Sequence, residues 1–145
     1  MFGHILIPID GSTLSAAAAD KAMAFAKEIG AKVTVVTVIE PFNALLMRAD
    51  ALSGVDATIE REARDAATRF LKEATLMAGS HGIKCETHVL ESNAPHQVIV
   101  AFAIEQKCDL IAMASHGRRG ISALILGSET LKVLTTSKIP VLVYR

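Results

Sequence analysis

The stretch MASHGRRGISALILGSETLKVL, residues 113–134, places two glycine-bearing turns on either side of a short apolar run. Gly117 and Gly120 belong to the first turn, and Gly127 belongs to the second. Glycines between a strand and a helix either shape a loop around a phosphate or only let the chain turn. Ser128 follows the second turn and is a good helix cap beside free N–H groups, so the stretch predicts a helix start and a candidate anion site.

Outward from this stretch, short apolar runs alternate with helical patterns along the whole chain. Strands are expected at residues 4–10, 32–40, 83–92, 108–115 and 139–145, and helices at 11–30, 55–77, 98–103 (after Pro95) and 128–137. Strands separated by helices run parallel in one sheet with helices on both faces, which predicts a single α/β domain over residues 1–145. The third strand alternates most clearly, so we expect it near a sheet edge. Residues 42–54 have no clear pattern and are expected to form a loop or a short helical lid.

Three strand ends carry the candidate site. Open parallel sheets bind ligands at the carboxyl ends of their strands, where the strand order reverses. Residues 8–10, 38–40 and 113–117 end the first, second and fourth strands. If the first and fourth strands are neighbours, Asp10 faces the glycine stretch across one crevice.

The polar residues of this crevice each have two interpretations. Asp10 is either a helix cap or turn former, or a carboxylate that accepts a ribose hydroxyl or holds a cation. Arg118 and Arg119 either neutralise phosphates or point into water. His116 is a ligand contact or a structural histidine, and the other histidines are scattered without metal-ligand spacing.

Composition limits the function classes. Fifteen basic residues balance fifteen acidic ones, which argues against nucleic-acid binding because that role rests on a basic excess. No signal peptide or membrane-length apolar run is present, so a cytoplasmic location without a membrane role is expected. Cys85 and Cys108 form no close-spaced motif and are expected to be free thiols. The Walker A, G-x-G-x-x-G, G-x-S-x-G, H-E-x-x-H and C-x-x-C patterns are absent.

The stretches HILIPIDGS, ASHGRRGISALILGSETLKVL and SKIPVLVYR together resemble the universal stress protein family over the whole chain. That resemblance implies an open five-stranded parallel sheet of order 3-2-1-4-5, Rossmann-like and similar to other adenine-nucleotide-binding α/β domains. The ATP-binding members carry G-x2-G-x9-G-[S/T]. Here Gly117, Gly127 and Ser128 match that motif around the spacer 118–126, whereas Ala114 replaces its first glycine.

The resemblance implies a role for each matching position. Gly117, Gly127, Ser128 and the main-chain amide of Glu129 would hold the phosphates of ATP, with Thr130 near them. The same segment contains Ala114, His116 and Arg118. Pro8, Ile9 and Asp10 would line the ribose and adenine side, and Val38 and Met113 would lie beside the base. Mg²⁺ would accompany the nucleotide, with Asp10 as the candidate protein ligand. If this position needs a positive φ or a close backbone approach, the methyl group of Ala114 costs about 1 kcal/mol or more.

Three functions remain open at this point. The first is a stress-response protein that binds ATP as a homodimer and acts in regulation, with the last strand pairing antiparallel through Val141 and Val143. The second is slow ATP hydrolysis or phosphoryl transfer, for which Asp10, His116 and Arg118 are the candidate groups. The third is a nucleotide-free interaction module, in which Ala114 closes the site.

Overall fold

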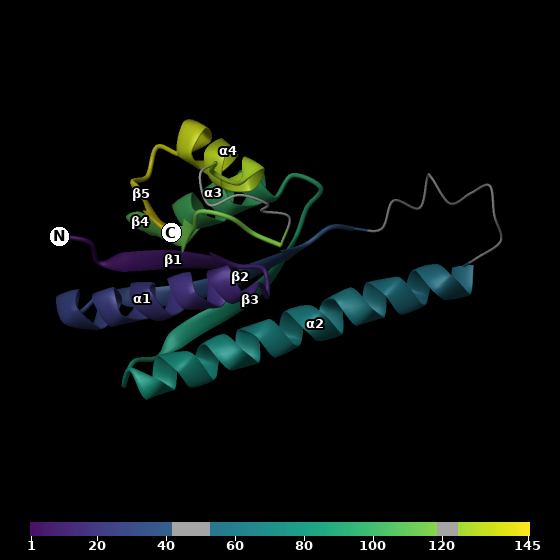
Figure 1. Ribbon diagram of the computed structural model, residues 1–145, viewed down its shortest axis with the longest axis horizontal. Coiled ribbons are helices and arrows are strands. Elements are labelled where there is room, and N and C mark those ends of the chain that lie inside the picture. Colours follow the sequence, from purple (N-terminus) through teal and green to yellow (C-terminus); the bar gives the residue numbers. More distant parts are fainter. Residues whose placement is uncertain (42–52, 119–124) are drawn as a thin grey trace.

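A computed structural model of the chain describes residues 1–41, 53–118 and 125–145, and within them strands and helices alternate (Figure 1). The strands are β1 (His4–Ile9), β2 (Lys32–Ile39), β3 (Cys85–Glu91), β4 (Leu110–Ala114) and β5 (Val141–Tyr144). The helices are α1 (Thr13–Ile29), α2 (Ser53–Ser80), α3 (Pro95–Glu105) and α4 (Ser128–Thr136). The predicted order of elements is therefore confirmed.

The five strands form one parallel sheet, as the alternation of strands and helices predicts, and its order β3-β2-β1-β4-β5 is the one that the family resemblance implies. β3 lies at an edge, which confirms the expectation from its alternating pattern. β1 pairs with β2 over its whole length, from His4–Lys32 to Ile9–Thr37, but it pairs with β4 only at Ile5–Leu110 and Leu6–Ile111. The carboxyl halves of β1 and β4 are therefore not paired with each other, although each is paired with its other neighbour, β2 or β5. The gap between them opens the crevice at the point where the strand order reverses.

Helices cover both faces of the sheet (Figure 1). Ile5 and Ile7 of β1 pack with residues of α1 and α2, whereas Leu6 packs with residues of α3 and α4, because alternate strand residues point to opposite faces. Alanines dominate the buried side of α1 at positions 18, 19, 22 and 26. Such small side chains let the helix lie close to the sheet.

Local signals explain where α1 begins and ends. Ser12 is the N-cap, and its hydroxyl oxygen accepts a hydrogen bond from Ser15 N–H at 3.1 Å. Gly11 lies in the preceding turn with φ 81°, so the helix begins after the predicted residue 11. Gly30 has φ 70° and ends the helix as expected, in the left-handed region that favours glycine.

Two boundaries differ from the sequence predictions in ways that affect the site. The N-cap of α4 is Gly127 rather than Ser128, and this N-cap residue makes no side-chain hydrogen bond. The fourth strand ends at Ala114, one residue earlier than predicted. Of the predicted loop or lid 42–54, residues 42–52 lie outside the described part, and residues 53 and 54 already belong to α2.

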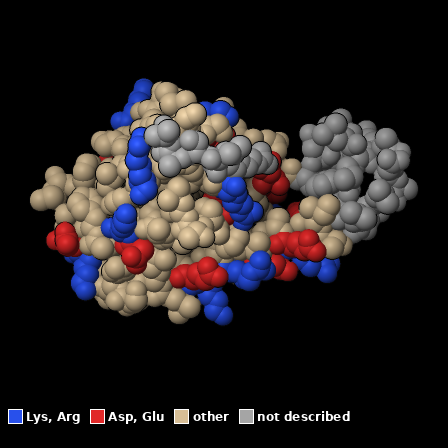
Figure 2. Space-filling model, in the orientation of Figure 1, with Lys and Arg blue, Asp and Glu red and all other residues tan. Residues whose placement is uncertain are grey.

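The surface is mixed in charge. Figure 2 shows basic and acidic side chains interspersed over one face of the molecule, in keeping with the equal numbers of the two kinds. A search of the described helices finds none with the length and apolarity that crossing a membrane requires.

Candidate functional site

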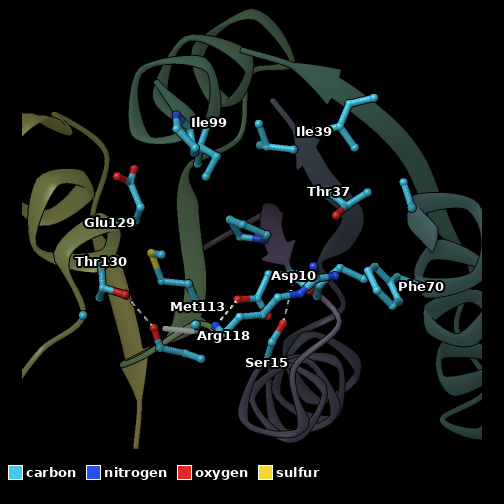
Figure 3. Close-up of a pocket in the computed structure, with 18 of the residues that line it drawn as sticks. Asp10, Ser15, Thr37, Ile39, Phe70, Ile99, Met113, Arg118, Glu129 and Thr130 are labelled. Carbon is cyan, nitrogen blue, oxygen red and sulfur yellow. Dashed lines mark hydrogen bonds between the residues drawn. The ribbon is translucent and has the colours of Figure 1, made fainter. Parts of the chain in front are cut away.

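A cavity of about 460 Å³ opens at the carboxyl ends of β1, β2 and β4 (Figure 3). The structure brings all of the predicted site residues to this cavity: Pro8, Ile9, Asp10, Val38, Met113, Ala114, His116, Gly117, Arg118, Gly127, Ser128, Glu129 and Thr130. Arg119, the other arginine of the predicted loop, lies outside the described residues. The cavity volume is in the range typical of small-molecule pockets.

One wall of the cavity was not predicted from the sequence. α2 contributes Ala63, Ala66, Ala67 and Phe70, which are spaced to lie on one face of the helix. Helical periodicity in the sequence predicts that this face of α2 packs against the rest of the protein. It does not predict that the part of the face from Ala63 to Phe70 borders a cavity. Ile39 and Glu40 of the predicted strand end 38–40 also line the cavity, as do Ser15, Thr37, Pro95 and Ile99, which had no sequence signal.

Asp10 joins two segments at the floor of the cavity. One carboxylate oxygen accepts a hydrogen bond from Ser12 N–H at 3.0 Å, and the other accepts one from Arg118 N–H at 2.8 Å. The main-chain N–H of Asp10 donates to the Ser15 hydroxyl oxygen at 3.1 Å. Asp10 thereby ties the turn after β1 to the loop after β4, which confirms its predicted role in the turn and places its carboxylate at the cavity.

Gly117 and Gly127 are needed because other atoms lie where a side chain would be, and not because their φ angles are positive. A Cβ at Gly117 would collide with the Asp10 carboxylate. A Cβ at Gly127 would lie 3.2 Å from both His116 Cα and the Ser115 carbonyl oxygen, which already accepts the Gly127 N–H at 2.7 Å. The two glycines therefore let the loop after β4 fold against β1 and against the start of α4.

Ala114 ends β4 in ordinary strand geometry. It is buried, its partner in the ladder is Tyr144 of β5, and its carbonyl oxygen accepts the Thr130 hydroxyl at 2.9 Å. In the part of the chain that the structure describes, Lys107 is the one non-glycine residue with positive φ. The backbone strain that a methyl group at this position could have caused is therefore absent.

The N-terminus of α4 faces the cavity without a side-chain cap from the described residues. The first N–H groups of a helix have no partner within the helix, and Gly127 supplies no side chain to bind them. Ser128, Glu129 and Thr130, which make up the first turn, line the cavity. Free N–H groups and the positive end of the helix dipole together suit an anion.

The Glu129 side chain is drawn toward α3. Its Oε2 accepts the His96 N–H at 3.0 Å and lies 3.3 Å from His96 Nδ1, while its Oε1 accepts from Lys132 Nζ at 3.1 Å. Partial burial alone would raise the pKa of Glu129, but these hydrogen bonds and the Lys132 charge outweigh it and hold the pKa below its usual range. Glu129 therefore stays ionised and serves as the N-terminal anion of α3, whose own N-cap, Ala94, has no capping side chain.

Phe70 and Arg118 meet on the α2 side of the cavity (Figure 3). The Arg118 Cζ lies 5.0 Å from the centre of the Phe70 ring, and Arg118 Nε donates to the Asp10 carbonyl oxygen. The same ring covers Gly11 so closely that a Cβ there would collide with it. The turn after β1, the glycine loop and α2 are thus joined at one contact.

His116 carries an unpaired polar atom. Its Nδ1 is hydrogen-bonded to the Ser115 hydroxyl at 2.9 Å. Its Nε2 is buried and has no hydrogen-bond partner among the described residues. Such an atom costs about 1–3 kcal/mol unless water or a ligand satisfies it.

The described residues offer no ready-made metal centre. Within 1–41, 53–118 and 125–145, no three His, Cys, Asp or Glu side chains gather as a metal site. A cation in this cavity would therefore need ligand atoms from a bound molecule, with Asp10 as the carboxylate nearest to the glycine loop.

The chain matches the model of the universal stress protein family over residues 1–145. It is 34% identical over 147 residues to universal stress protein MJ0531 of Methanocaldococcus jannaschii, covering 100% of this chain and 83% of that protein. It is 30% identical over 152 residues to universal stress protein YxiE of Bacillus subtilis, covering all of both chains.

Solved structures share the fold. Universal stress protein UspA from Lactobacillus plantarum has a TM-score of 0.86 at 21% identity, with 99% of this chain and 98% of that chain covered. A universal stress protein in complex with cAMP has a TM-score of 0.74 at 26% identity, with 99% and 97% covered. The universal stress protein from Archaeoglobus fulgidus in complex with dAMP has a TM-score of 0.62 at 21% identity, with 100% and 98% covered. The full-length family match and these relatives show that the chain belongs to the universal stress protein family.

Proposed function

We propose that this stress-response protein binds an adenine nucleotide, ATP, with the phosphates at the N-terminus of α4. The observation that carries the proposal is an uncapped helix N-terminus opening onto a cavity of about 460 Å³. The Glu129 carboxylate, which would repel a phosphate, is engaged with His96 and Lys132. A relative that is 26% identical was solved with cAMP, which supports the choice of an adenine nucleotide.

The base would lie on the apolar side of the cavity. Val38 and Met113 come from the ends of β2 and β4, and Ile9 and Pro8 form the adjoining surface. The ladder between β1 and β2 stops at Ile9–Thr37, so the β1-facing main-chain groups of β2 beyond Thr37 have no partner in that ladder. Such groups suit the hydrogen-bonding edge of a purine.

Asp10 would lie beside the ribose. Each of its carboxylate oxygens accepts one main-chain N–H and keeps a further lone pair for a hydroxyl or a metal-bound water. Mg²⁺ accompanying ATP would neutralise phosphate charge, and Asp10 would be its candidate protein contact.

The site favours binding over turnover. Phosphoryl transfer needs charge neutralisation at the transferred group and an oriented nucleophile. Arg118 is held on the α2 side against Phe70, away from the start of α4, and no lysine is among the described lining residues. We therefore propose a regulatory protein that reports nucleotide occupancy, in preference to an ATPase or phosphotransferase.

A homodimer would form along β5. The Ile111 N–H donates to the Pro140 carbonyl oxygen and the Ser115 N–H donates to the Tyr144 carbonyl oxygen, so alternate residues of β5 face β4. Val141 and Val143 therefore direct their N–H and C=O groups toward the free edge. Two copies of this edge would pair antiparallel about a twofold axis. Both cysteines are free, in keeping with a cytoplasmic location.

The test begins with the protein as purified. It is desalted and denatured, and the released nucleotide is identified by mass spectrometry; the nucleotide-free protein is then titrated with ATP by calorimetry. We expect an adenine nucleotide in the released fraction and saturable ATP binding. The absence of both a released nucleotide and a titration signal at millimolar ATP would reject the proposal.

A cavity-filling variant locates the binding. Ala66→Trp places a large ring in the cavity from α2 and should abolish ATP binding. Leu76→Trp is the matched control, because Leu76 lies on the same helix but is 69% exposed and lies outside the cavity lining. Equal ATP affinities in the two variants would place the nucleotide elsewhere.

A further inference from the structure

The Arg118 guanidinium is held in a fixed place at the cavity. The main-chain N–H of Arg118 is bound to the Asp10 carboxylate and its Nε to the Asp10 carbonyl oxygen. Its Cζ lies 5.0 Å from the centre of the Phe70 ring. Stacking on an aromatic ring and a hydrogen bond from Nε fix the plane of a guanidinium without using its terminal nitrogens.

Among the described residues, no acceptor lies within hydrogen-bond distance of Arg118 Nη1 or Nη2. The side chain is exposed and lines the cavity. A planar, immobilised guanidinium with a free edge is a typical group for binding a phosphate through two parallel hydrogen bonds.

This cation and the anion site of α4 lie on opposite sides of the cavity. Figure 3 shows Glu129 and Thr130 of α4 on one side, and the end of Arg118 beside Phe70 on the other. At the α4 position, the Glu129 carboxylate pairs with His96 and Lys132, whereas Asp10, which accepts two main-chain N–H groups, keeps its negative charge beside Arg118. One cavity therefore presents two separate positive positions.

We propose that, within the adenine nucleotides, the cavity binds nucleoside bisphosphates, which carry a second phosphate on the ribose, more tightly than the corresponding monophosphates. This inference rests on the proposed nucleotide function and deepens it. The 5′ phosphate occupies the N-terminus of α4, and the phosphate on the 2′ or 3′ hydroxyl meets the free edge of Arg118. Arg118 then determines ligand specificity. A residue that only held the loop against α2 would not change which nucleotide is preferred.

The experiment compares adenosine 5′-monophosphate with adenosine 3′,5′-bisphosphate and adenosine 2′,5′-bisphosphate by calorimetry at low and physiological salt. The measured quantity is the ratio of dissociation constants, because a general loosening of the loop weakens all three ligands and leaves the ratio unchanged. For the wild type, we expect at least one bisphosphate to bind about tenfold more tightly than the monophosphate. The preference should decrease with salt, since Arg118 is exposed.

Three variants test whether the Arg118 side chain causes the preference for bisphosphates. Arg118→Ala should bring the ratio close to one, and Arg118→Lys should restore only part of it, because an ammonium group lacks the planar fork. Arg69→Ala is the matched control: Arg69 is adjacent to Phe70 in α2, is exposed, and lies outside the cavity lining, so removing its charge should leave the ratio unchanged.

Each outcome decides between the two proposals. Monophosphate binding with a ratio of one in the wild type overturns this inference and leaves the proposed function standing. A preference that survives Arg118→Ala, or that Arg69→Ala removes equally, also overturns it. If neither AMP, ATP nor a bisphosphate binds, both proposals are rejected.

Discussion

At the scale of single residues, the glycine loop is shaped by the Asp10 carboxylate. One carboxylate oxygen binds the Arg118 N–H at 2.8 Å and occupies the space that a side chain at position 117 would need. Gly117 is therefore required by a neighbouring carboxylate, independently of any phosphate. The same Asp10 oxygen lies close to Gly117 and accepts the Arg118 N–H, so one contact explains both observations.

This contact predicts coupling between the two residues. Gly117→Ala should destabilise the protein by about 1–3 kcal/mol, because either the loop or the carboxylate must move. Asp10→Ala should also destabilise it, since two main-chain N–H groups lose their acceptor. In the double variant the two costs should not add, with a coupling of about 0.5–3 kcal/mol in urea denaturation. Strict additivity would show that the two side chains do not compete for space.

Ala114 gives a second prediction at this scale. Because Ala114 lies in a strand without positive φ, Ala114→Gly relieves no strain and should not improve ATP affinity. It should instead lower stability by about 0.5–1 kcal/mol, the cost of glycine in a strand interior. Calorimetric titration and thermal unfolding test both parts. A gain of ATP binding from none would favour the nucleotide-free module.

At the scale of elements, α3 and α4 are joined by the Glu129 carboxylate. The side chain leaves the first turn of α4 and reaches the first turn of α3. The α4 N-terminus stays open toward the cavity as a consequence, and the start of α3 gains the anion that its own N-cap lacks. One residue thus satisfies one helix end and leaves the other free for a ligand.

The Glu129 contacts predict a pH-dependent contribution to stability. Since the folded-state pKa lies below the ordinary value of 4.5, ionised Glu129 stabilises the folded protein above that pH, and the contribution is lost as pH falls through the folded-state pKa. Glu129→Gln should lower the urea midpoint at pH 7, and the difference from the wild type should shrink progressively below pH 4.5. Glu105→Gln, at an exposed position at the end of α3, is the control. A difference that is constant with pH would contradict the assignment.

Local sequence signals predicted the elements themselves but not the contacts between them. Buried apolar runs such as Ile5–Ile7 and helical spacing are local signals, so the strands, the helices and the strand ends at the crevice were predictable. The role of a position such as Thr130 came instead from the family resemblance. The cap of α4 was not predictable, because Gly127 has an extended φ and ψ that place it just outside the helix, leaving Ser128 as the first helical residue. The contact between Phe70 and Arg118 was also beyond prediction, since it depends on how α2 lies against a loop distant in sequence.

At the scale of the whole molecule, β5 lies at the edge of the sheet, and this edge predicts a homodimer. Val143→Pro removes an N–H that points away from β4, so it should produce a monomer without disturbing the sheet. Val143→Ala keeps that N–H and is the control. Light scattering after size-exclusion chromatography measures both masses. A dimer of the proline variant, or a monomeric wild type, would reject pairing through β5.

The central claim is that a nucleotide occupies the crevice between the carboxyl ends of β1 and β4. Hydrogen exchange followed by mass spectrometry, with and without ATP, tests it most directly. We expect ATP to slow exchange in three separate segments, residues 10–15, 113–118 and 127–131, because each of them contributes residues to the lining of this cavity. Unchanged exchange in all three at saturating ATP, or protection confined to another part of the chain, would contradict the account.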